Sequence, residues 1–430
     1  MEKAVYDACV RIIHAELVAA MGCTEPIAIA YCSAKAARVL GALPEKIRVT
    51  CSGNIVKNVK GVVVPNSGGM KGIDVAAVLG AVGGDPDRML EVIAGVGQEA
   101  REKAAQLLQD KDYCRVSVME SGDNLHIEVS VQSGAHSAAV EIRGGHTNIV
   151  RIERDGEILY SAQASIQSET PSAMELARMK ELLSVKGILD FAGEADLDLV
   201  REPLELQIEN NSRISMEGLK NDYGVRVGKS LLNKQNAGDL TVRARAVAAA
   251  GSDARMSGCS LPVVINSGSG NQGITVSMPV IEYAREMNAS HDQLLRALIV
   301  SNLISIHQKR FLGSLSAYCG ATSAACGAVC GIAYLCGEGY DTIANTITNT
   351  IATIGGMVCD GAKPSCAAKI ASALDAAFMA FELQRNGGVF APGEGLVRSD
   401  VEKTIRAVGQ MGREGMKSTD SEILDIMLSE

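Results

Sequence analysis

Three cysteines in the second half of the chain have the type and spacing expected of metal ligands. Cys359 lies forty residues after Cys319, and Cys366 follows it after six intervening residues. Structural zinc usually takes paired cysteines with about two to four residues between them. Three well-separated thiolates suit an iron-sulfur cluster with one open iron better than they suit a closed tetrahedral zinc site. We therefore predict that these three cysteines hold such a cluster.

The local sequence around these thiols favours the same interpretation. Cys319 precedes the helical pattern GATSAACGAVCGIAYL, and Cys366 begins the pattern CAAKIASALDAAFMAFELQ. Free amide groups at a helix N-terminus favour anions and lower the pKa of a thiol, so we expect these two side chains to be thiolates. Two alternatives stay open. Cys326 and Cys330 share a helical stripe with Cys319 and form either another ligand set or a buried face of small residues.

A fourth thiol, Cys23, stands at the start of a helix near the N-terminus. The stretch AMGCTEPIAIA places Cys23 directly before a helix predicted over residues 24–40. Glu25 falls in the first turn, where acidic residues are favoured, and Pro26 falls where a missing N–H costs little. The sequence thus predicts a reactive cysteine at the tip of a helix.

Two glycine-rich turns supply small polar groups that could hold a substrate. INSGSGNQGIT and PNSGGMKGID each contain Asn-Ser-Gly, and their amides could cradle a carboxylate. Neither turn matches a P-loop or a dinucleotide-binding motif, so a small amino acid is a better ligand than a nucleotide. No lysine has an evident pyridoxal phosphate setting, and we expect no such cofactor. The candidate substrate-binding residues are Asn66, Lys71, Asn266, Ser267, Ser269 and Asn271.

Two histidines are weaker candidates for acid–base chemistry. His146 in GGHTNI lies at a predicted strand turn and could face a site, and His307 in SIHQKR could act near the cysteine helix. Half-buried histidines, however, more often serve packing and hydrogen bonding.

The elements that must position these residues fall into two parts. Residues 1–168 alternate between helical patterns, to about Ala20 and over 24–40 and 74–109, and β-like runs at 46–65, 113–120, 124–132, 136–145 and 147–162. The last four runs read as an antiparallel meander. Residues 169–430 show helical patterns separated by Gly- and Pro-containing turns. We predict an α+β fold with an N-terminal domain over 1–168, which carries Cys23, and a larger all-helical domain over 169–430.

Charge and hydropathy exclude some classes of partner. The chain has a formal charge of -9 and lacks the basic character of proteins that hold phosphate backbones, so we expect no nucleic acid partner. The amphipathic N-terminus has no apolar core of a signal peptide, which predicts a cytoplasmic protein. Residues 311–337 are uncharged but rich in Gly, Ala, Ser and Cys, and we interpret them as a buried central helix rather than a membrane span. Alanine-rich helical surfaces make a homo-oligomer possible.

Four motifs together resemble a known family. GCTEP, NSGSGNQGI, GSLSAYCGATSAACGA and GGMVCDGAKPSC are similar to motifs of the L-cysteine desulfidase family (the UPF0597 group), which is related to the α domain of iron-sulfur L-serine dehydratases. The resemblance implies a [4Fe-4S] cluster on Cys319, Cys359 and Cys366 and a catalytic Cys23. It also implies a reaction, in which L-cysteine and water give pyruvate, ammonia and sulfide.

Two rival functions remain at this point. The segment between Cys359 and Cys366 is shorter than its counterpart in serine dehydratases, which favours the desulfidase branch, but the resemblance leaves the leaving group open. An iron-sulfur L-serine dehydratase is therefore the first rival. The second is a non-catalytic iron-sulfur protein that senses iron or redox state. A metal-free scaffold whose cysteines fill the core is the simplest alternative.

Overall fold

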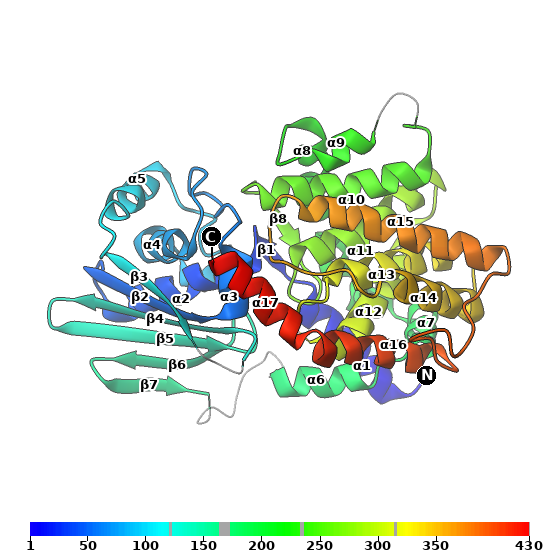
Figure 1. Cartoon of the computed structure of the whole chain (residues 1–430), viewed down its shortest axis with the longest axis horizontal. Helices are drawn as coiled ribbons and strands as arrows, with labels where there is room; N and C mark the ends of the chain where they lie inside the picture. Colours follow the sequence, from blue (N-terminus) through cyan, green and yellow to red (C-terminus); the bar gives the residue numbers. More distant parts are fainter. Residues whose placement is uncertain (120–122, 163–172, 233–235, 314–315, 430) are drawn as a thin grey trace.

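The computed structural model describes residues 1–119, 123–162, 173–232, 236–313 and 316–429. A six-stranded sheet with helices forms one side of the molecule, and a larger bundle of helices forms the other (Figure 1). The α+β fold predicted from the sequence is confirmed. The helical part also contains one short strand, β8 (Pro262–Val264).

The sheet is mostly, but not wholly, the predicted meander. Its strands are β2 (Lys46–Ser52), β3 (Cys114–Met119), β4 (His126–Ser133), β5 (His136–Arg143), β6 (Ile149–Arg154) and β7 (Glu157–Ser161). Strands β4 to β7 pair antiparallel in sequence order, as predicted. The meander prediction is wrong for β3, because β2 lies between β3 and β4 and pairs parallel with β3. The predicted run 147–162 forms two strands rather than one.

Helices cover one face of this sheet. α2 (Thr24–Leu40) contacts β4 and β5, and α4 (Ile73–Gly83) packs against α2, with α5 (Gln98–Leu107) beyond it. The helix predicted over 24–40 is confirmed at both ends. The β prediction for 46–65 is wrong after Ser52, where α3 (Gly53–Val59) begins. Within it Ile55, Val56 and Val59 are buried, a spacing that suits one face of a helix.

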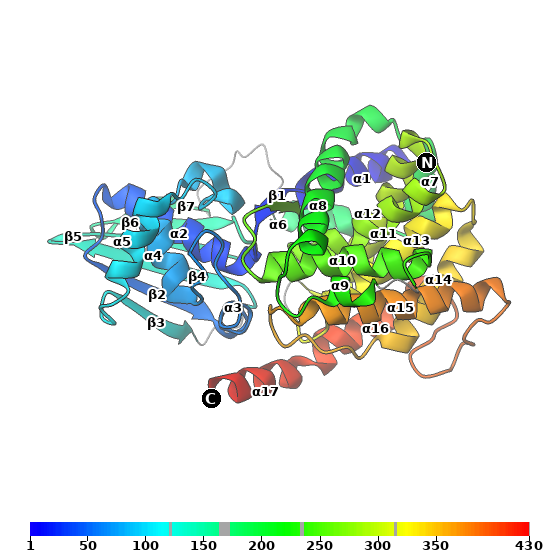
Figure 2. The ribbon, with the colours of Figure 1, turned by 90° about the horizontal axis from the view of Figure 1, so that it is seen from above.

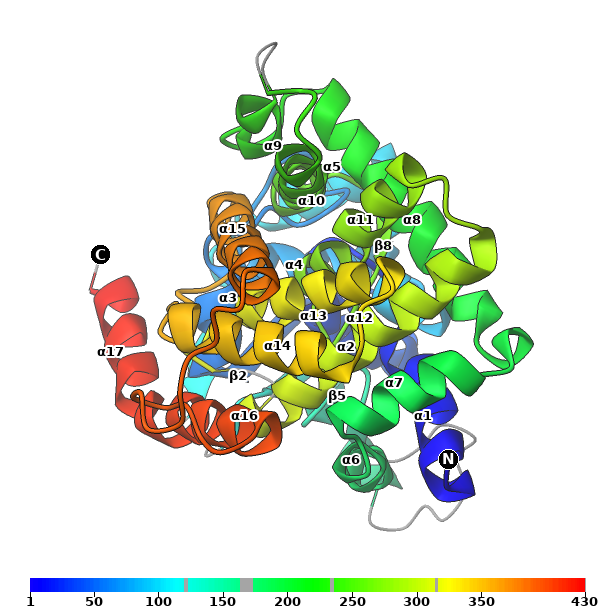
Figure 3. The same ribbon diagram turned by 90° about the vertical axis from the view of Figure 1, so that its right-hand side faces the viewer.

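The helical part is built around α13. Its helices are α6 (Ala173–Glu181), α7 (Val185–Glu194), α8 (Arg201–Lys220), α9 (Val227–Leu231), α10 (Leu240–Met256), α11 (Gly270–Glu286), α12 (His291–Leu312), α13 (Gly320–Leu335), α14 (Tyr340–Ile354), α15 (Cys366–Arg385), α16 (Val401–Gln410) and α17 (Lys417–Leu428). α13 contacts α11, α12, α14 and α15 and is buried over most of its length (Figure 3). The predicted buried central helix is thus confirmed over 320–335. None of the described helices combines the length and hydropathy that crossing a membrane requires.

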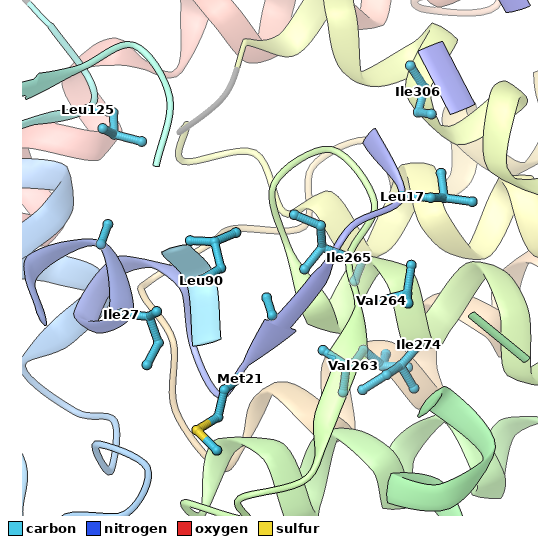
Figure 4. Close-up of a cluster of buried hydrophobic side chains, with 14 of the residues drawn as sticks. Leu17, Met21, Ile27, Leu90, Leu125, Val263, Val264, Ile265, Ile274 and Ile306 are labelled. Carbon is cyan, nitrogen blue, oxygen red and sulfur yellow. The ribbon is translucent and has the colours of Figure 1, made fainter. Parts of the chain in front are cut away.

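Two N-terminal elements tie the parts together. α1 (Lys3–Glu16) ends earlier than the predicted position near Ala20, and β1 (Ala19–Met21) follows it. β1 pairs antiparallel with β8, with Ala19 opposite Val264. The backbone groups of residues 19–21 are therefore paired with β8 instead of with a further turn of helix. Side chains of both strands, Met21 and Val263 among them, join one apolar cluster (Figure 4). α1 itself packs on α6 and α7 of the helical part, and the domain division at residue 168 stays a prediction.

Close helix contacts in the bundle depend on glycine. Gly218 of α8 faces α10, where an added Cβ would lie 2.0 Å from the carbonyl oxygen of Ala250. A backbone oxygen cannot move aside as the end of a flexible side chain can, so the helices themselves must separate. We expect Gly218→Ala to lower the free energy of unfolding by about 1–3 kcal/mol.

Urea unfolding of the Gly218 variant would measure this change. Gly193→Ala is the matched control, because Gly193 lies in α7 and an added Cβ there has no atom within 4 Å. Alanine at that position should leave stability unchanged or raise it by up to about 1 kcal/mol. Equal effects of the two substitutions would contradict the proposed contact.

Candidate functional site

A cavity of about 700 Å³ lies where the sheet-containing part meets the helical bundle. Both parts contribute to its walls, which is a common location for small-molecule sites. The sheet-containing part provides Cys23, Glu25, Asn58 and His146, and the helical part provides Arg255, Ser267, Ser269, Asn271, Gln272, Lys309, Cys319, Cys359, Cys366 and Lys369, among others. The four cysteines that the sequence singled out therefore share one cavity.

Two short backbone pairings hold the cysteine loops together. Cys319 is the residue before α13, and Cys359 lies in the loop after α14. The Cys319 amide donates to the Met357 carbonyl at 2.9 Å, and the Cys359 amide donates to the Ala317 carbonyl at 2.6 Å. Cys366 begins α15, and its thiol points back toward the Gly361 carbonyl at 3.6 Å. Segments that are distant in sequence thus present three thiols to one wall.

The protonation of these thiols differs from the prediction. The hydrogen bond from Cys319 lowers the pKa of Cys359 to about 6, with help from the charges of Lys57 and Lys309 and against the effect of burial. The same hydrogen bond, together with burial, raises the pKa of Cys319. Burial also raises the pKa of Cys366. In the metal-free protein these effects oppose the thiolates expected of Cys319 and Cys366 at their helix N-termini: the hydrogen bond with Cys359 and burial act on Cys319, and burial acts on Cys366.

The donor set fits an iron-sulfur cluster. Three thiols face one cavity and interact electrostatically with one another. No three His, Cys, Asp or Glu side chains in the described ranges converge as ligands of a single metal ion. A cluster makes a different demand, because each thiolate binds a different iron and the ligands are spread apart. Lys309 and Lys369, both close enough to act on Cys319 and Cys359, would offset the negative charge of bound thiolates.

Cys23 belongs to a second polar group, on the wall that the sheet-containing part contributes. It precedes α2, is 3% exposed, and its thiol donates to Glu25 Oε2 at 2.9 Å. Glu25 Oε1 accepts from Asn58 at 3.2 Å and lies 3.8 Å from His146 Nε2. Burial, together with the charge of Glu25, raises the pKa of Cys23 well above its ordinary value. Cys23 is therefore a thiol with a carboxylate beside it, contrary to the tuned thiolate that its helix position suggested.

Cys23 also approaches the cluster ligands directly. A small apolar cluster contains Cys23, Val62 and Met256, and Ala362 and Cys366 pack against it. The residue before Cys23 packs closely against Pro65, since an added Cβ at Gly22 would lie 2.1 Å from Pro65 Cγ. Cys23 therefore lies close to Cys366, a proposed cluster ligand more than three hundred positions later in the chain.

Glu25 gives the fold a measurable pH dependence. Although burial acts to raise its pKa, the neighbouring His146 and the hydrogen bond from Cys23 lower it from 4.5 to about 2. An acid whose pKa is lower in the folded than in the unfolded protein stabilises the folded state at pH values above its unfolded pKa. This stabilisation is lost as the acid becomes protonated. The stabilisation is thus full above pH 4.5 and lost as the pH falls toward 2.

We expect Glu25→Gln to remove a contribution on the order of 3 kcal/mol at neutral pH. Urea unfolding at a series of pH values would show the difference between wild type and variant shrinking below about pH 4.5. Asp360, whose pKa is also lowered to about 2, titrates in both proteins and cancels in the difference. A difference that is independent of pH would contradict the ionised state of Glu25.

The downstream Asn-Ser-Gly turn reaches the cavity. Ser267, Ser269 and Asn271 line it, with Ser267 in the left-handed region at φ 50°. Ser269 caps α11, and Asn271 Oδ1 accepts from Arg255 at 3.1 Å. Asn266 lies behind them, fully buried, with its amide bonded to Asn302. It supports the turn rather than lining the cavity.

The upstream turn does not reach the cavity. Asn66 donates its amide to the carbonyls of Ile93 and Ala94 at 3.0 and 3.2 Å, and Lys71 lies on an exposed segment. Neither residue lines the cavity. The two turns share the Asn-Ser-Gly pattern. In the upstream turn, however, the Asn66 side chain holds its own loop against the backbone of Ile93 and Ala94.

The amino-acid sequence matches the serine dehydratase alpha chain family over residues 87–425. The chain belongs to this family. Among curated relatives, the UPF0597 protein of Lachnoclostridium phytofermentans is 49% identical over 99% of this chain and 100% of its own. Those of Desulfitobacterium hafniense and Treponema denticola are 48% and 44% identical, covering 99% and 100% of this chain and 97% and 100% of theirs. The resemblance seen in the four motifs is confirmed, and the chain is a serine dehydratase-like protein.

Several cavity residues of this family member were missed from the sequence. Lys309 is 6% exposed and lines the cavity, and within the described ranges no carboxylate pairs with its ammonium group. His146, weighed as structural, has its Nε2 buried at the cavity without a hydrogen-bond partner among those residues. Glu25, which also lines the cavity, was interpreted from the sequence only as a residue that favours the start of a helix. Polar residues inside otherwise apolar helical patterns, such as Lys309 in ISIHQKRFL, were the available signal. His307 instead bonds Glu402 at 2.8 Å, outside the cavity.

Proposed function

We propose that this serine dehydratase-like protein is an L-cysteine desulfidase, a carbon–sulfur lyase with a [4Fe-4S] cluster on Cys319, Cys359 and Cys366. The observation that carries the proposal is the shared cavity, which is lined by these three thiols, by Cys23 and by basic residues that include Arg255, Lys309 and Lys369. A bound cluster with one open iron would supply a Lewis acid that stabilises charge developing on the leaving sulfur. The family and the four motifs support the same reaction class.

Substrate binding is assigned to residues around the cysteine wall. Lys309 is buried at the cavity with no carboxylate paired to it among the described residues, and burial lowers the pKa of its ammonium group. A bound substrate carboxylate would stabilise its charged form. Ser267 and Asn271 offer hydrogen-bonding groups for the amino and carboxylate groups of an amino acid. Gln272 packs against Gly320, where an added Cβ would lie 2.6 Å from its Cδ, so the turn sits directly beside Cys319.

Two proton transfers are needed for elimination. A base removes the proton from Cα, the Cβ–S bond breaks, and the leaving sulfur takes up a proton. His146 Nε2 lines the cavity without a hydrogen-bond partner among the described residues, 3.8 Å from Glu25 Oε1, and we assign it as the base. Cys23 is held as a thiol, so it is suited to protonate the leaving sulfur rather than to remove the Cα proton. Glu25, between the two, stabilises a protonated His146 and offers a path for the proton back to Cys23.

The remaining steps need no further group from the protein. Elimination leaves 2-aminoacrylate, which tautomerises to an imine and is hydrolysed by water to pyruvate and ammonia. Atoms balance, since one L-cysteine and one water give one pyruvate, one ammonia and one hydrogen sulfide. The protein must only exclude water until the carbon–sulfur bond has broken, which the buried position of Cys23 and Lys309 favours.

Steady-state kinetics of the reconstituted enzyme under anaerobic conditions test the proposal. We expect kcat/KM for L-cysteine to exceed that for L-serine, with pyruvate and sulfide formed in equal amounts. The opposite order would replace the assignment by an L-serine dehydratase, the function that the name of the matched family favours. A reconstituted cluster without turnover of either amino acid would favour the iron- or redox-sensing alternative.

A further inference from the structure

The last helix, α17, leaves the helical part and docks on α3 of the sheet-containing part (Figures 1 and 2). Leu424 lies over Gly53, where an added Cβ would be 2.4 Å from Leu424 Cδ2. Lys60 Nζ donates to the Met427 carbonyl. None of the residues of α17 is buried, so the helix adds little to the core. Its contacts with α3 are therefore the feature that needs an explanation.

Lys57 is the buried member of this contact. Its side chain is 2% exposed, and its ammonium group pairs with Asp420 of α17, whose side chain is 17% exposed. Asp420 is the only carboxylate that pairs with Lys57 within the described ranges. Removing one member of a buried ion pair leaves the other charge uncompensated, which is strongly unfavourable. The position of Lys57 thus depends on the docking of α17.

Lys57 in turn touches the segment that follows Cys359. An added Cβ at Gly361 would lie 2.3 Å from the Lys57 carbonyl oxygen and 3.4 Å from its Cγ. The ammonium group also acts electrostatically on Cys359. The next residue, Asn58, donates to Glu25 at 3.2 Å on the other wall. The short helix α3 therefore contacts both the cysteine wall and the Cys23 wall.

The residues leading into α17 are anchored beside the other cysteine loop. Gly412 lies in a π-helical turn, Met411–Gly415, and an added Cβ there would be 3.0 Å from the Tyr318 ring. Ser316 Oγ donates to the Gly412 carbonyl at 3.1 Å. Turns of this kind often occur at functional sites. The C-terminal segment thus contacts the Cys319 loop at one end and, through Lys57, the Cys359 loop at the other.

From these contacts we infer that α17 is a latch that holds the two walls of the cavity in register, with Asp420 as a positioning residue. Asp420 fixes Lys57, Lys57 supports the segment 359–361, and the same helix α3 keeps Asn58 on Glu25. This role of α17 goes beyond the proposed function. Only the measurement of kcat rests on that function, whereas the measurement of Cys359 reactivity does not. It assigns a role to a surface helix that the sequence did not single out.

Alkylation of full-length, cluster-free protein by iodoacetamide at fixed pH tests the latch. The rate at Cys359 is followed by peptide mass spectrometry, with the exposed Cys336 as an internal reference. We expect Asp420→Asn to accelerate modification of Cys359 by about tenfold, since local opening exposes the thiol, while Cys336 is unchanged. Asp420→Glu should restore most of the protection. Asp425→Asn, an exposed carboxylate on the same helix, is the control and should match wild type.

The reconstituted variant supplies a second readout. We expect Asp420→Asn to lower kcat and Asp420→Glu to recover most of it, because only a carboxylate at this position pairs with the buried Lys57. Asp425→Asn should retain the wild-type kcat. Unchanged Cys359 reactivity would overturn the latch, and equal acceleration at Cys359 and Cys336 would do so too, because it indicates general loosening. Absence of lyase activity in wild type would instead contradict the proposed function and leave the alkylation comparison intact as the test of the latch.

Discussion

Replacing Cys319, Cys359 or Cys366 by Ser should abolish both the cluster and lyase activity in the reconstituted protein. The three thiols are presented by two loops and one helix start that the fold brings to a single wall. A hydroxyl is a far weaker ligand for iron than a thiolate, and a cluster with two remaining protein ligands is poorly held. We expect turnover to fall by about a thousandfold or more, as for loss of a Lewis acid that stabilises the leaving group.

Iron and acid-labile sulfide per chain, together with the visible absorbance of the cluster, measure this first prediction. Cys336→Ser is the control, because Cys336 is an exposed thiol at the end of α13 and does not line the cavity. It should retain full cluster content. A full cluster in any of the three variants would remove that cysteine from the ligand set and return Cys326 or Cys330 to consideration.

Replacing Cys23 by Ser should retain the cluster and lose most turnover. Cys23 lies on the opposite wall from the proposed ligands and donates to Glu25. A serine hydroxyl can keep that hydrogen bond but is a much weaker acid than a thiol, so it protonates a leaving sulfur poorly. Loss of a general acid typically costs about 10²- to 10⁴-fold in rate, and we expect kcat to fall within that range.

The second prediction is measured by kcat and by the cluster absorbance of the same samples. Cys32→Ser is the matched control on the same helix α2, where the thiol donates to the Val140 carbonyl at 3.2 Å and lies outside the cavity. It should leave kcat close to wild type. Full activity of Cys23→Ser would exclude this residue from the mechanism, whereas loss of the cluster would make Cys23 a fourth ligand.

Local signals predicted much of the fold correctly. The helix 24–40 was predicted with its start residues, and the strands β4 and β5 lie within the predicted β-like runs 124–132 and 136–145 apart from a residue at the end of β4. The errors came from tertiary partners. β1 exists because β8, some 240 residues later, pairs with it, and β3 leaves the meander because β2 pairs on that side. Such pairings leave no trace in a window of ten residues.

The site was predictable where it depended on residue type and spacing. The cysteines 23, 319, 359 and 366 were singled out and share the cavity. Their protonation was not predictable, because burial is a property of the folded chain and reverses the effect of a helix N-terminus. Lys71 was selected for its charge but does not line the cavity, whereas Lys309, hidden in an apolar helical pattern, is one of the basic residues that do.

The most direct test of a cluster-dependent desulfidase is anaerobic reconstitution with graded amounts of iron and sulfide, with pyruvate and sulfide release from L-cysteine measured for each sample. We predict activity that rises in proportion to cluster content, reaches its maximum near one cluster per chain, and disappears when air destroys the cluster. Activity that is independent of cluster content, or a full cluster that yields neither product, would contradict the assignment.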